Sequence, residues 1–370
     1  MVINSNEIPY VNLSKQWQDE KHDLLVIIDR VLSTGQYVGG EEIEKFENDI
    51  ANTCKVDHVI ALNSGTDALT LALRAVGIRP NDEVITPPNS FIASTSAITS
   101  IGATPVFVDV LPDQNINPDL IESAITDKTK AIMPVHLTGR MCQMEEIMHI
   151  ANKYNLYVIE DAAQAIRSEY NQRPSGSIGH VGCFSTHPLK NLNACGDGGF
   201  VTTNDQSIAV KVKSLRNHGM IDRATIKEFG TVSRMDNLQA AILNYRLQKL
   251  DDVIEKRREN AQKYFLGLDS SRIFVPAEKQ NEYNTYHTFV IQTNHRDQLK
   301  KHLLNSGIET AIHYPIPIHL QPASRCLGYQ KGSLPVAERQ AERILTLPIN
   351  QNLRLGQIEK IISSINGFFS

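Results

Sequence analysis

One lysine in this chain stands where it could carry covalent chemistry. Lys190 lies in the phrase Ser185-Thr186-His187-Pro188-Leu189-Lys190-Asn191, and Gly196-Asp197-Gly198-Gly199 follow shortly after it. A lysine bonds to an aldehyde only when its amine has lost its proton, and a partly desolvated site favours that neutral form. A lysine in a solvated loop has no such reactivity. The chemistry of Lys190 therefore depends on whether other segments form a pocket for an aldehyde cofactor.

A second segment has the features of an anion site. Ser64-Gly65-Thr66 follow a strongly apolar run and open a helical pattern, and the N–H groups at the start of a helix bind anions such as phosphate. Gly65 allows the backbone to approach a ligand closely. Ser185 could add a hydroxyl group to the same anion. The alternatives are an ordinary helix N-cap at Ser64 or Thr66 and a simple turn at Ser185.

Three further residues could hold a flat heteroaromatic ring. Asp161 ends an apolar run, where a carboxylate can pair with a protonated pyridine nitrogen, bind a metal or cap a helix. Gln164 follows three residues later and could hydrogen-bond to a ring hydroxyl, while Phe91 could stack on the ring or pack in the core. With Lys190 as the amine, these residues predict a pyridoxal phosphate site. The chain contains no GxGxxG, Walker, HExxH or GxSxG motif that would indicate a different chemistry.

The elements that must position these residues alternate between β-rich and helical patterns over the first two-thirds of the chain. Such alternation is typical of a parallel sheet covered by helices, which binds ligands beyond the carboxyl ends of its strands. The predicted strands are residues 56–62, 83–86, 104–110, 130–135 and 157–160. The predicted helices between them are residues 65–76, 90–101, 118–124 and 144–155.

The pattern changes after about residue 205. Residues 207–216 favour a helix, and residues 236–268 favour one long amphipathic helix that would bridge to a second domain. Beyond the bridge, residues 286–292 alternate as a strand and residues 297–306 return to a helix. We therefore expect a large domain over residues 1–254 and a small C-terminal domain over residues 255–370.

Composition excludes several classes of protein. The chain has 370 residues, 41% hydrophobic residues and a net charge of −4, with its Lys and Arg residues scattered, which argues against nucleic-acid and anionic-membrane partners. No secretory signal or long apolar span is visible, so a cytoplasmic protein is expected. The five cysteines are far apart and never spaced as CxxC, which indicates free thiols rather than disulfides or a zinc site.

Five blocks in order resemble the DegT/DnrJ/EryC1/StrS sugar aminotransferases. The match covers nearly the whole chain, from Gly35-Gln36-Tyr37-Val38-Gly39-Gly40 to His313-Tyr314-Pro315. The five blocks read Ser64-Gly65-Thr66-Asp67-Ala68-Leu69, Gly102-Ala103-Thr104-Pro105-Val106-Phe107-Val108-Asp109, Glu160-Asp161-Ala162-Ala163-Gln164, His187-Pro188-Leu189-Lys190-Asn191 and Arg234-Met235-Asp236-Asn237-Leu238-Gln239-Ala240-Ala241. The resemblance implies an α/β fold, the three-layer fold type I of aspartate aminotransferase. Its large domain holds a mostly parallel sheet, and its smaller C-terminal domain is α+β. The resemblance also implies a homodimer with its active sites at the interface and pyridoxal phosphate as the cofactor.

The resemblance assigns roles to eleven residues. Lys190 becomes the lysine that bonds to the cofactor, and Asp161 becomes the partner of its pyridine nitrogen. The phosphate ligands are Gly65, Thr66 and Ser185, and the ring contacts are Gln164 and Phe91. The acceptor pocket is lined by His313, Tyr314 and His319, with Tyr37 entering from the partner subunit. Two departures from the family stand out. Val232 occupies the place of an Asn that reaches the phosphate across the interface, where Ser233 or Arg234 could compensate. Ile166-Arg167 replaces a common His-Gly.

The expected reaction is transfer of an amino group from glutamate to a keto-sugar, nucleotide-linked in most of the family, for amino-sugar synthesis in cell-surface polysaccharide such as lipopolysaccharide. The lysine at position 190 argues against the branch of the family that has histidine there and dehydrates sugars. The alternatives are an aminotransferase acting on a free keto-sugar such as an oxidised octulosonate, a dehydratase that keeps the lysine, and a cofactor-binding regulator.

Overall fold

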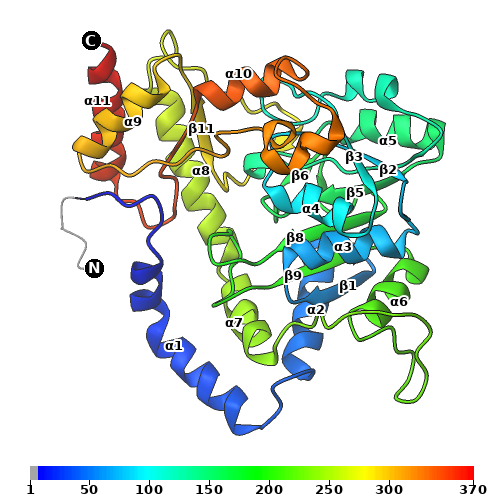
Figure 1. Ribbon diagram of the computed structural model, residues 1–370. Coiled ribbons are helices and arrows are strands. Elements are labelled where there is room, and N and C mark those ends of the chain that lie inside the picture. The colour runs from blue at the N-terminus through cyan, green and yellow to red at the C-terminus, as the bar shows by residue number, and fades with distance from the viewer. Residues whose placement is uncertain (1–6) are drawn as a thin grey trace.

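The computed structural model describes residues 7–370 and shows a large three-layer α/β domain joined to a smaller α+β domain (Figure 1). Seven strands form the central sheet in the order β1-β9-β8-β5-β4-β2-β3. Their bounds are His58–Leu62 (β1), Glu83–Thr86 (β2), Thr104–Phe107 (β3), Thr129–Ile132 (β4), Tyr157–Asp161 (β5), Val181–Ser185 (β8) and Gly199–Thr203 (β9). The predicted fold class is confirmed.

The central sheet is mostly parallel. Neighbouring strands pair in parallel along the series β3-β2-β4-β5-β8. Strand β9 pairs antiparallel with both β8 and β1. All five strands predicted from the sequence are present, with ends that differ at four of them. Strands β8 and β9, which flank Lys190, were not predicted.

Alternation along the strands gives the sheet two buried faces. In β1, Ile60 and Leu62 pack on one side and Val59 and Ala61 on the other. The first side is covered by α3 (Gly65–Ala75), α4 (Ile92–Ser100) and α6 (Gln206–Leu215). The second side is covered by α2 (Glu41–Cys54), α5 (Met144–Tyr154) and α7 (Asn237–Leu247). These two helical layers and the sheet between them are the three layers of the large domain.

The predicted single bridge helix is two helices. Helix α7 ends at Leu247, and α8 (Leu250–Gly267) begins after a turn at residues 248 and 249. The turn lets α7 pack against α2 and the N-terminal helix α1 (Leu13–Ser33), while α8 runs on to the small domain (Figure 1). The predicted domain boundary at residue 254 falls inside α8 and stays a prediction.

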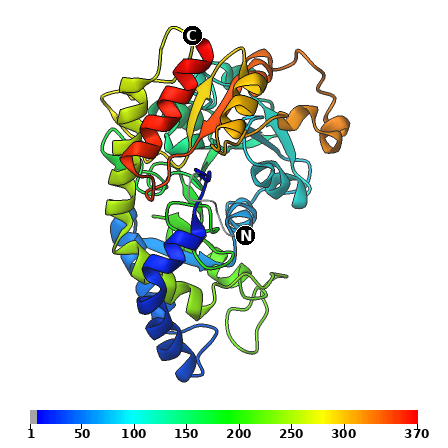
Figure 2. The same cartoon turned by 90° about the vertical axis from the view of Figure 1, so that its left-hand side faces the viewer.

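The small domain has its own hydrophobic core. Strands β11 (Phe289–Gln292) and β12 (Ile344–Leu347) pair antiparallel and pack against α8, α9 (Arg296–Asn305) and α11 (Leu355–Phe369). Helix α10 (Pro335–Arg343) lies between this core and the large domain, as the turned view shows (Figure 2). A separate small sheet is formed by β6 (Glu169–Tyr170), β7 (Arg173–Pro174) and β10 (Glu282–Tyr283).

Two further expectations need correction. Residues 118–124 form the 3₁₀ turns η1 (Pro118–Leu120) and η2 (Glu122–Ala124) instead of a helix, because a segment this short gains too few hydrogen bonds to offset helix nucleation. Helices α1 and α2 were not predicted. Other 3₁₀ turns are η3 (Leu137–Gly139), η4 (Ile318–Leu320) and η5 (Pro322–Leu327). Within residues 7–370, no helix is both long and apolar enough to cross a membrane.

Candidate active site

The N-terminus of α3 lies against the end of β8 and forms the candidate phosphate cradle. Ser64 caps the helix, its Oγ accepting a hydrogen bond from the Asp67 N–H at 3.1 Å, so the N-cap expected as an alternative is present. The preceding N–H groups of this first turn lack partners within the helix. A Cβ atom on Gly65 would lie 2.6 Å from the Cβ of Ser185. Only glycine therefore lets the Ser185 hydroxyl come this close to the start of the helix.

Lys190 lies in the connection between the antiparallel strands β8 and β9. Backbone hydrogen bonds hold this connection, among them Thr186 N–H to Gly198 O at 2.8 Å and Lys190 N–H to His187 O at 2.8 Å. The Nδ2 of Asn191 donates to the carbonyl of Thr285 at 3.1 Å, which ties the turn to the small-domain side. The side chain of Lys190 is therefore carried on a rigid segment next to the cradle.

The environment of Lys190 favours its reactive form. Burial lowers the pKa of its amine from 10.5 to about 8, and the charge of Asp161 opposes part of that shift. The amine forms no ion pair in the part of the chain that the structure describes. A neutral amine is therefore accessible near physiological pH, as an imine-forming lysine requires.

Asp161, the last residue of β5, is a buried carboxylate without a cation bonded to it. It is 5% exposed, and its Oδ2 accepts a hydrogen bond from Ser94 Oγ at 2.6 Å while Oδ1 accepts from the Ala163 N–H at 3.2 Å. Burial raises its pKa, and the bonds from Ser94 and Ala163 and the charge of Lys190 only partly oppose that rise. The role of Ser94 was missed because a serine in the first turn of a helix carries no distinctive sequence signal.

A buried pair supports Asp161 from behind. The Nε2 of His136 lies 2.8 Å from Oε2 of Glu160, and His136 Nδ1 accepts the N–H of Cys142, which makes Nε2 the protonated nitrogen. The backbone N–H of His136 also donates to the backbone carbonyl of Asp161 at 3.0 Å. Burial alone would raise the pKa of Glu160, but the contacts with His136 and backbone N–H groups outweigh it and lower that pKa.

Gln164, Phe91 and Tyr314 gather around Asp161. The Oε1 of Gln164 accepts the Thr138 N–H at 2.8 Å, and the side chain also hydrogen-bonds to the hydroxyl of Tyr314. The rings of Phe91 and Tyr314 are 5.9 Å apart, tilted at 43°. Burial, with the charge of Asp161, raises the pKa of Tyr314 to about 12. Phe91 keeps 55% of its surface exposed, so its ring is available to a ligand instead of packed in the core.

Two histidines complete this group. His313 Nδ1 lies 3.0 Å from Thr346 Oγ1, and burial together with the charge of Lys190 lowers its pKa to about 4. His287 was not singled out from the sequence, yet burial and the neighbouring charges of Lys190 and Arg257 lower its pKa well below the usual value. Both imidazoles are neutral at physiological pH. They offer hydrogen-bonding groups without adding positive charge.

Two of the predicted substrate residues lie apart from this group. His319 is 2% exposed, and its Nε2 lies 3.0 Å from Glu338 Oε1 within a cluster that contains the ring of Phe107. Contact with a substrate would require displacement of the His319 side chain.

Tyr37 is 57% exposed, and its backbone carbonyl accepts the Asn237 N–H. Its entry from a partner stays a prediction.

The two departures from the family pattern have structural consequences. Ile166 is buried in the large-domain core, and Arg167 NH2 lies 2.6 Å from Asp251 Oδ1 on α8. This change therefore repacks the wall behind the site. Val232 is 48% exposed, whereas the neighbouring Ser233 is buried and donates from its Oγ to Asn63 Oδ1 at 3.1 Å.

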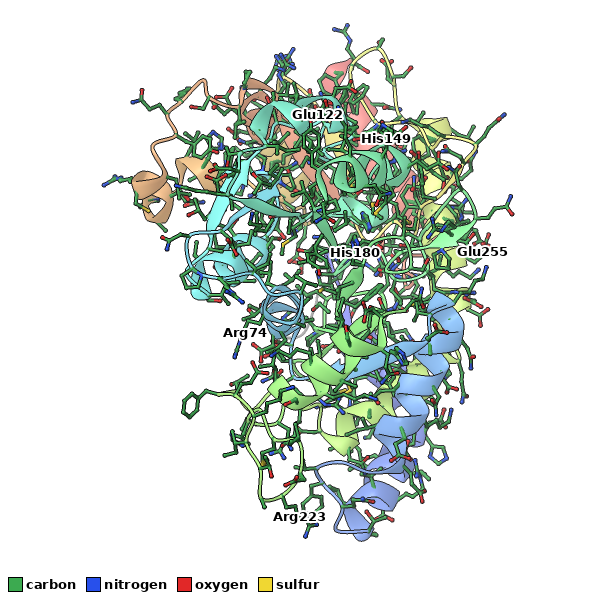
Figure 3. The ribbon with its side chains drawn as sticks, turned by 90° about the vertical axis from the view of Figure 1, so that its right-hand side faces the viewer. Arg74, Glu122, His149, His180, Arg223 and Glu255 are labelled. Atoms are coloured by element: carbon green, nitrogen blue, oxygen red, sulfur yellow. The ribbon has the colours of Figure 1, made fainter. Side chains whose placement is uncertain are left out.

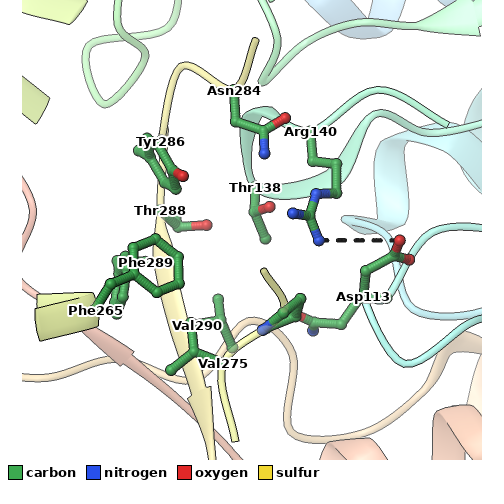
Figure 4. Close-up of a pocket in the computed structure, with 12 residues that line it drawn as sticks. Asp113, Thr138, Arg140, Phe265, Val275, Asn284, Tyr286, Thr288, Phe289 and Val290 are labelled. Carbon is green, nitrogen blue, oxygen red and sulfur yellow. Dashed lines mark ion pairs between the residues drawn. The ribbon is translucent and has the colours of Figure 1, made fainter. Parts of the chain in front are cut away.

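A small enclosed cavity lies on the small-domain side of Thr138 (Figure 4). Its volume is about 30 Å³, which is room for a single water molecule. Arg140 and Tyr286 contribute to its walls, and Arg140 NH1 lies 4.0 Å from Asp113 Oδ2. The cavity is too small to hold a cofactor or a sugar, so we assign the chemistry to the group around Lys190.

The arrangement fits pyridoxal phosphate. A carboxylate whose pKa is raised by burial suits a protonated pyridine nitrogen, which would add a positive charge beside it. The glycine-lined helix N-terminus beside Ser185 suits the phosphate. The lysine with a lowered pKa suits the aldehyde. A large domain of fold type I with this site defines a pyridoxal-phosphate-dependent aminotransferase.

Comparison with known proteins gives the family. Residues 18–366 match the model of the DegT/DnrJ/EryC1/StrS aminotransferase family. The chain is 40% identical over 97% of its length and 95% of the relative's to the dTDP-3-amino-3,4,6-trideoxy-alpha-D-glucose transaminase of Streptomyces venezuelae. It is also 40% identical over 98% of both chains to a protein of Geobacillus stearothermophilus named pleiotropic regulatory protein. Further relatives are named transaminases of dTDP-linked or UDP-linked sugars with the amino or keto group at carbon 3.

Solved structures agree. DesV of S. venezuelae in complex with a ketimine intermediate superposes with a TM-score of 0.96 at 39% identity, covering 98% of this chain and 99% of that one. Solved relatives hold the cofactor in its pyridoxal or pyridoxamine form. The chain belongs to the DegT/DnrJ/EryC1/StrS aminotransferase family, and its cofactor is pyridoxal phosphate.

Proposed function

We propose that this enzyme transfers an amino group from glutamate to carbon 3 of a nucleotide-linked 3-keto sugar, for the synthesis of cell-surface polysaccharide. The observation that carries the amino-transfer step is the lowered pKa of Lys190 beside the buried Asp161. The acceptor class is supported by the relatives, whose names place the amino or keto group at carbon 3 of a dTDP-linked or UDP-linked sugar.

Lys190 has two tasks in this proposal. Its Nζ would hold the aldehyde cofactor, and as a free amine it would take the proton from the Cα of the amino donor. When bound, pyridoxal phosphate supplies an electron sink for the pair left at that carbon. A lysine with a pKa of about 8 can both accept and return a proton near neutral pH. The Asp161 carboxylate would hold the proton on the pyridine nitrogen.

The neighbouring residues bind and orient. Gly65, Thr66 and Ser185 would hold the phosphate, Gln164 the ring hydroxyl and Phe91 the exposed face of the ring. On the small-domain side, His313 and His287 are close enough to Lys190, and Tyr314 to Asp161, for these charges to shift their pKa values together with burial. These three side chains would offer hydrogen bonds to the hydroxyl groups of a sugar. Neutral partners on this side suit a sugar ring, because they give hydrogen bonds without attracting a competing anion to the carbonyl.

A homodimer with shared sites is supported by the exposed residues of the large domain. The loop from residue 219 to 230 projects from the domain, with Arg223 near its far end and Arg74 of α3 at its base (Figure 3). Phe229 in this loop is 92% exposed, and Val232 just beyond it is 48% exposed. Apolar side chains so exposed on one face indicate a protein contact. The hydroxyl of Ser233 is bonded to its own Asn63, whereas Arg234 uses only NH1 on its own Asn217, at 3.4 Å, and its remaining N–H groups could reach a partner's phosphate.

The test is a half-reaction. The holoenzyme is mixed with glutamate, and conversion of the cofactor to its amino form is followed by absorbance together with release of the 2-oxo acid. We expect equal amounts of both, and none with Lys190→Ala, while Lys331→Ala, at an exposed lysine, behaves as the wild type. A dehydratase would consume a sugar without releasing the 2-oxo acid. A regulator would give no conversion.

The acceptor is identified by offering the amino form a panel of keto-sugars. We expect nucleotide-linked 3-keto hexoses to regenerate the resting cofactor, and 4-keto hexoses and oxidised octulosonates to do so far more slowly. A preference for an unlinked sugar would remove the nucleotide from the proposal.

For the shared site, Val232→Asn restores the amide usual in the family, and we expect it to slow cofactor loss on dialysis. Sedimentation should give twice the mass of one chain.

A further inference from the structure

An open pocket in the small domain is strongly basic. Its volume is about 420 Å³, within the range of about 300–1,000 Å³ typical of small-molecule sites. It lies where the loop at Pro112 of the large domain meets β11 and α10 of the small domain. Arg272, Arg339 and Arg343 line it, and its lining includes no aspartate or glutamate. The pocket is distinct from the group around Lys190, since the two share no residue.

None of the three guanidinium groups is bonded to another group in the part of the chain that the structure describes. Neither an ion pair nor a side-chain hydrogen bond involves Arg272, Arg339 or Arg343 in residues 7–370. The nearby carboxylates are engaged elsewhere. Asp269 accepts the N–H and the hydroxyl of Ser271, and Glu342 faces Lys331 at 3.9 Å. Three positive charges therefore face one hollow, where the charge of Asp269 acts on Arg272 at a distance and no carboxylate is bonded to any of the three within residues 7–370.

The arrangement is unfavourable for the empty chain. Arg339 and Arg343 are four residues apart on α10, so they stand on the same face of the helix, where like charges repel. The helix dipole favours Arg343, which lies in the last turn, but it offers nothing to Arg339 and Arg272. An anion bound between the three would turn this repulsion into attraction. Arginine also suits phosphate geometrically, since its fork donates two parallel hydrogen bonds.

A neutral group in the same pocket lacks a partner as well. Gln340 is 4% exposed, and its Nε2 donates to the carbonyl of Leu111 at 2.8 Å, but its buried Oε1 has no hydrogen-bond partner. A buried acceptor left unpaired costs about 1–3 kcal/mol. Thr293 lines the pocket beside it. An acceptor next to an anion site suits a ligand that carries a hydroxyl group in addition to its phosphate.

We propose that this pocket binds a small phosphorylated ligand, with a phosphate or diphosphate held by Arg272, Arg339 and Arg343 and a ligand hydroxyl donating to Gln340 Oε1. The residues of the pocket come from both domains: the Gln340 amide bonds to Leu111 O, and Gln292 Nε2 donates to Pro112 O at 3.1 Å. An occupant therefore bridges the domains and stabilises the arrangement in which they meet. The site is independent of the amino-transfer reaction.

The test is calorimetric titration of inorganic pyrophosphate into the holoenzyme at low ionic strength without divalent cations. The holoenzyme is used because its phosphate cradle at α3 is already filled by the cofactor. We expect saturable binding at one site per chain, with an affinity that falls as salt is added. Arg339→Ala with Arg343→Ala should weaken it about tenfold or more, as the loss of a charge-assisted hydrogen bond predicts. Arg79→Ala with Arg173→Ala, which removes the same charge elsewhere, should leave it unchanged.

Arg272→Ala provides a second test on a different segment of the chain. It should weaken pyrophosphate binding by itself, and melting curves establish that each variant is folded. Ribose 5-phosphate then tests the hydroxyl contact: its affinity should fall in Gln340→Leu while that of pyrophosphate does not. Absence of saturable binding to the wild type would overturn the proposal. Equal weakening by the control pair would also overturn it, since binding would then follow net charge alone.

Discussion

Replacement of Asp161 by asparagine separates the two steps in which Lys190 takes part. The structure gives the amine a pKa of about 8, with the charge of Asp161 holding it above the value that burial alone would set. Removing that charge at constant shape should lower the pKa of Lys190 further. The variant should therefore capture free cofactor at lower pH than the wild type. It should nevertheless turn over poorly, because the pyridine nitrogen has lost its anionic partner.

The size of the first effect follows from the two pKa values. At pH 7 an amine with a pKa of about 8 is neutral in about one chain in eleven, whereas at 10.5 it is neutral in about one in three thousand, a difference of roughly 300-fold. Capture by the wild-type apoenzyme should rise with pH, with its midpoint near pH 8 and a plateau above it, because the protonated form, present below the pKa, does not react. For the second effect, loss of a buried charged hydrogen bond worth about 1.5–3 kcal/mol predicts a fall in turnover of about tenfold to a hundredfold.

Stopped-flow absorbance of apoenzyme mixed with pyridoxal phosphate over a pH series measures capture, and the glutamate half-reaction measures turnover. Lys190→Ala sets the baseline without a covalent bond, and Lys331→Ala controls for lysine loss at an exposed position. A wild-type midpoint near 10.5 would refute the claim that burial activates Lys190. Identical midpoints in wild type and Asp161→Asn would refute the electrostatic link between the two residues. Unchanged turnover in the variant would refute the role of Asp161.

Three further predictions concern the surroundings of the site. Gly65→Ala should speed cofactor loss on dialysis, because the new Cβ would lie 2.6 Å from Ser185 Cβ and the clash would cost about 1–3 kcal/mol. The control Gly356→Ala places its Cβ in open space and should leave cofactor retention unchanged. Ser94→Ala should slow the half-reaction by about tenfold, since it removes the 2.6 Å bond to the buried aspartate, with little change in melting temperature. Glu160→Gln should make the melting temperature depend less on pH in the acid range. A carboxylate whose pKa is lowered by folding stabilises the fold at pH values above its unfolded pKa of 4.5, and that stabilisation is lost as the pH falls.

Much of the site was predictable because its residues follow strand ends. Asp161 and Ser64-Gly65-Thr66 come after apolar runs that could be recognised as strands, and the carboxyl ends of parallel strands meet at one edge of a sheet. Contacts between distant segments could not be predicted in this way. The bond from Ser94 and the proximity of His287 depend on how helices and the small domain pack, and no local pattern encodes that packing.

The acceptor-side loop shows why a motif alone could not assign its members. Tyr314 and His319 belong to one proline-rich segment and were predicted together, yet Tyr314 hydrogen-bonds to Gln164 whereas His319 pairs with Glu338 on α10. The segment changes direction between them, because the 3₁₀ turn η4 (Ile318–Leu320) carries His319 into the cluster around Phe107. A histidine buried against a carboxylate anchors the segment there, and that anchor holds Tyr314 against Phe91. From this buried place His319 would act on the site by positioning the loop, and its contact with a substrate stays a prediction.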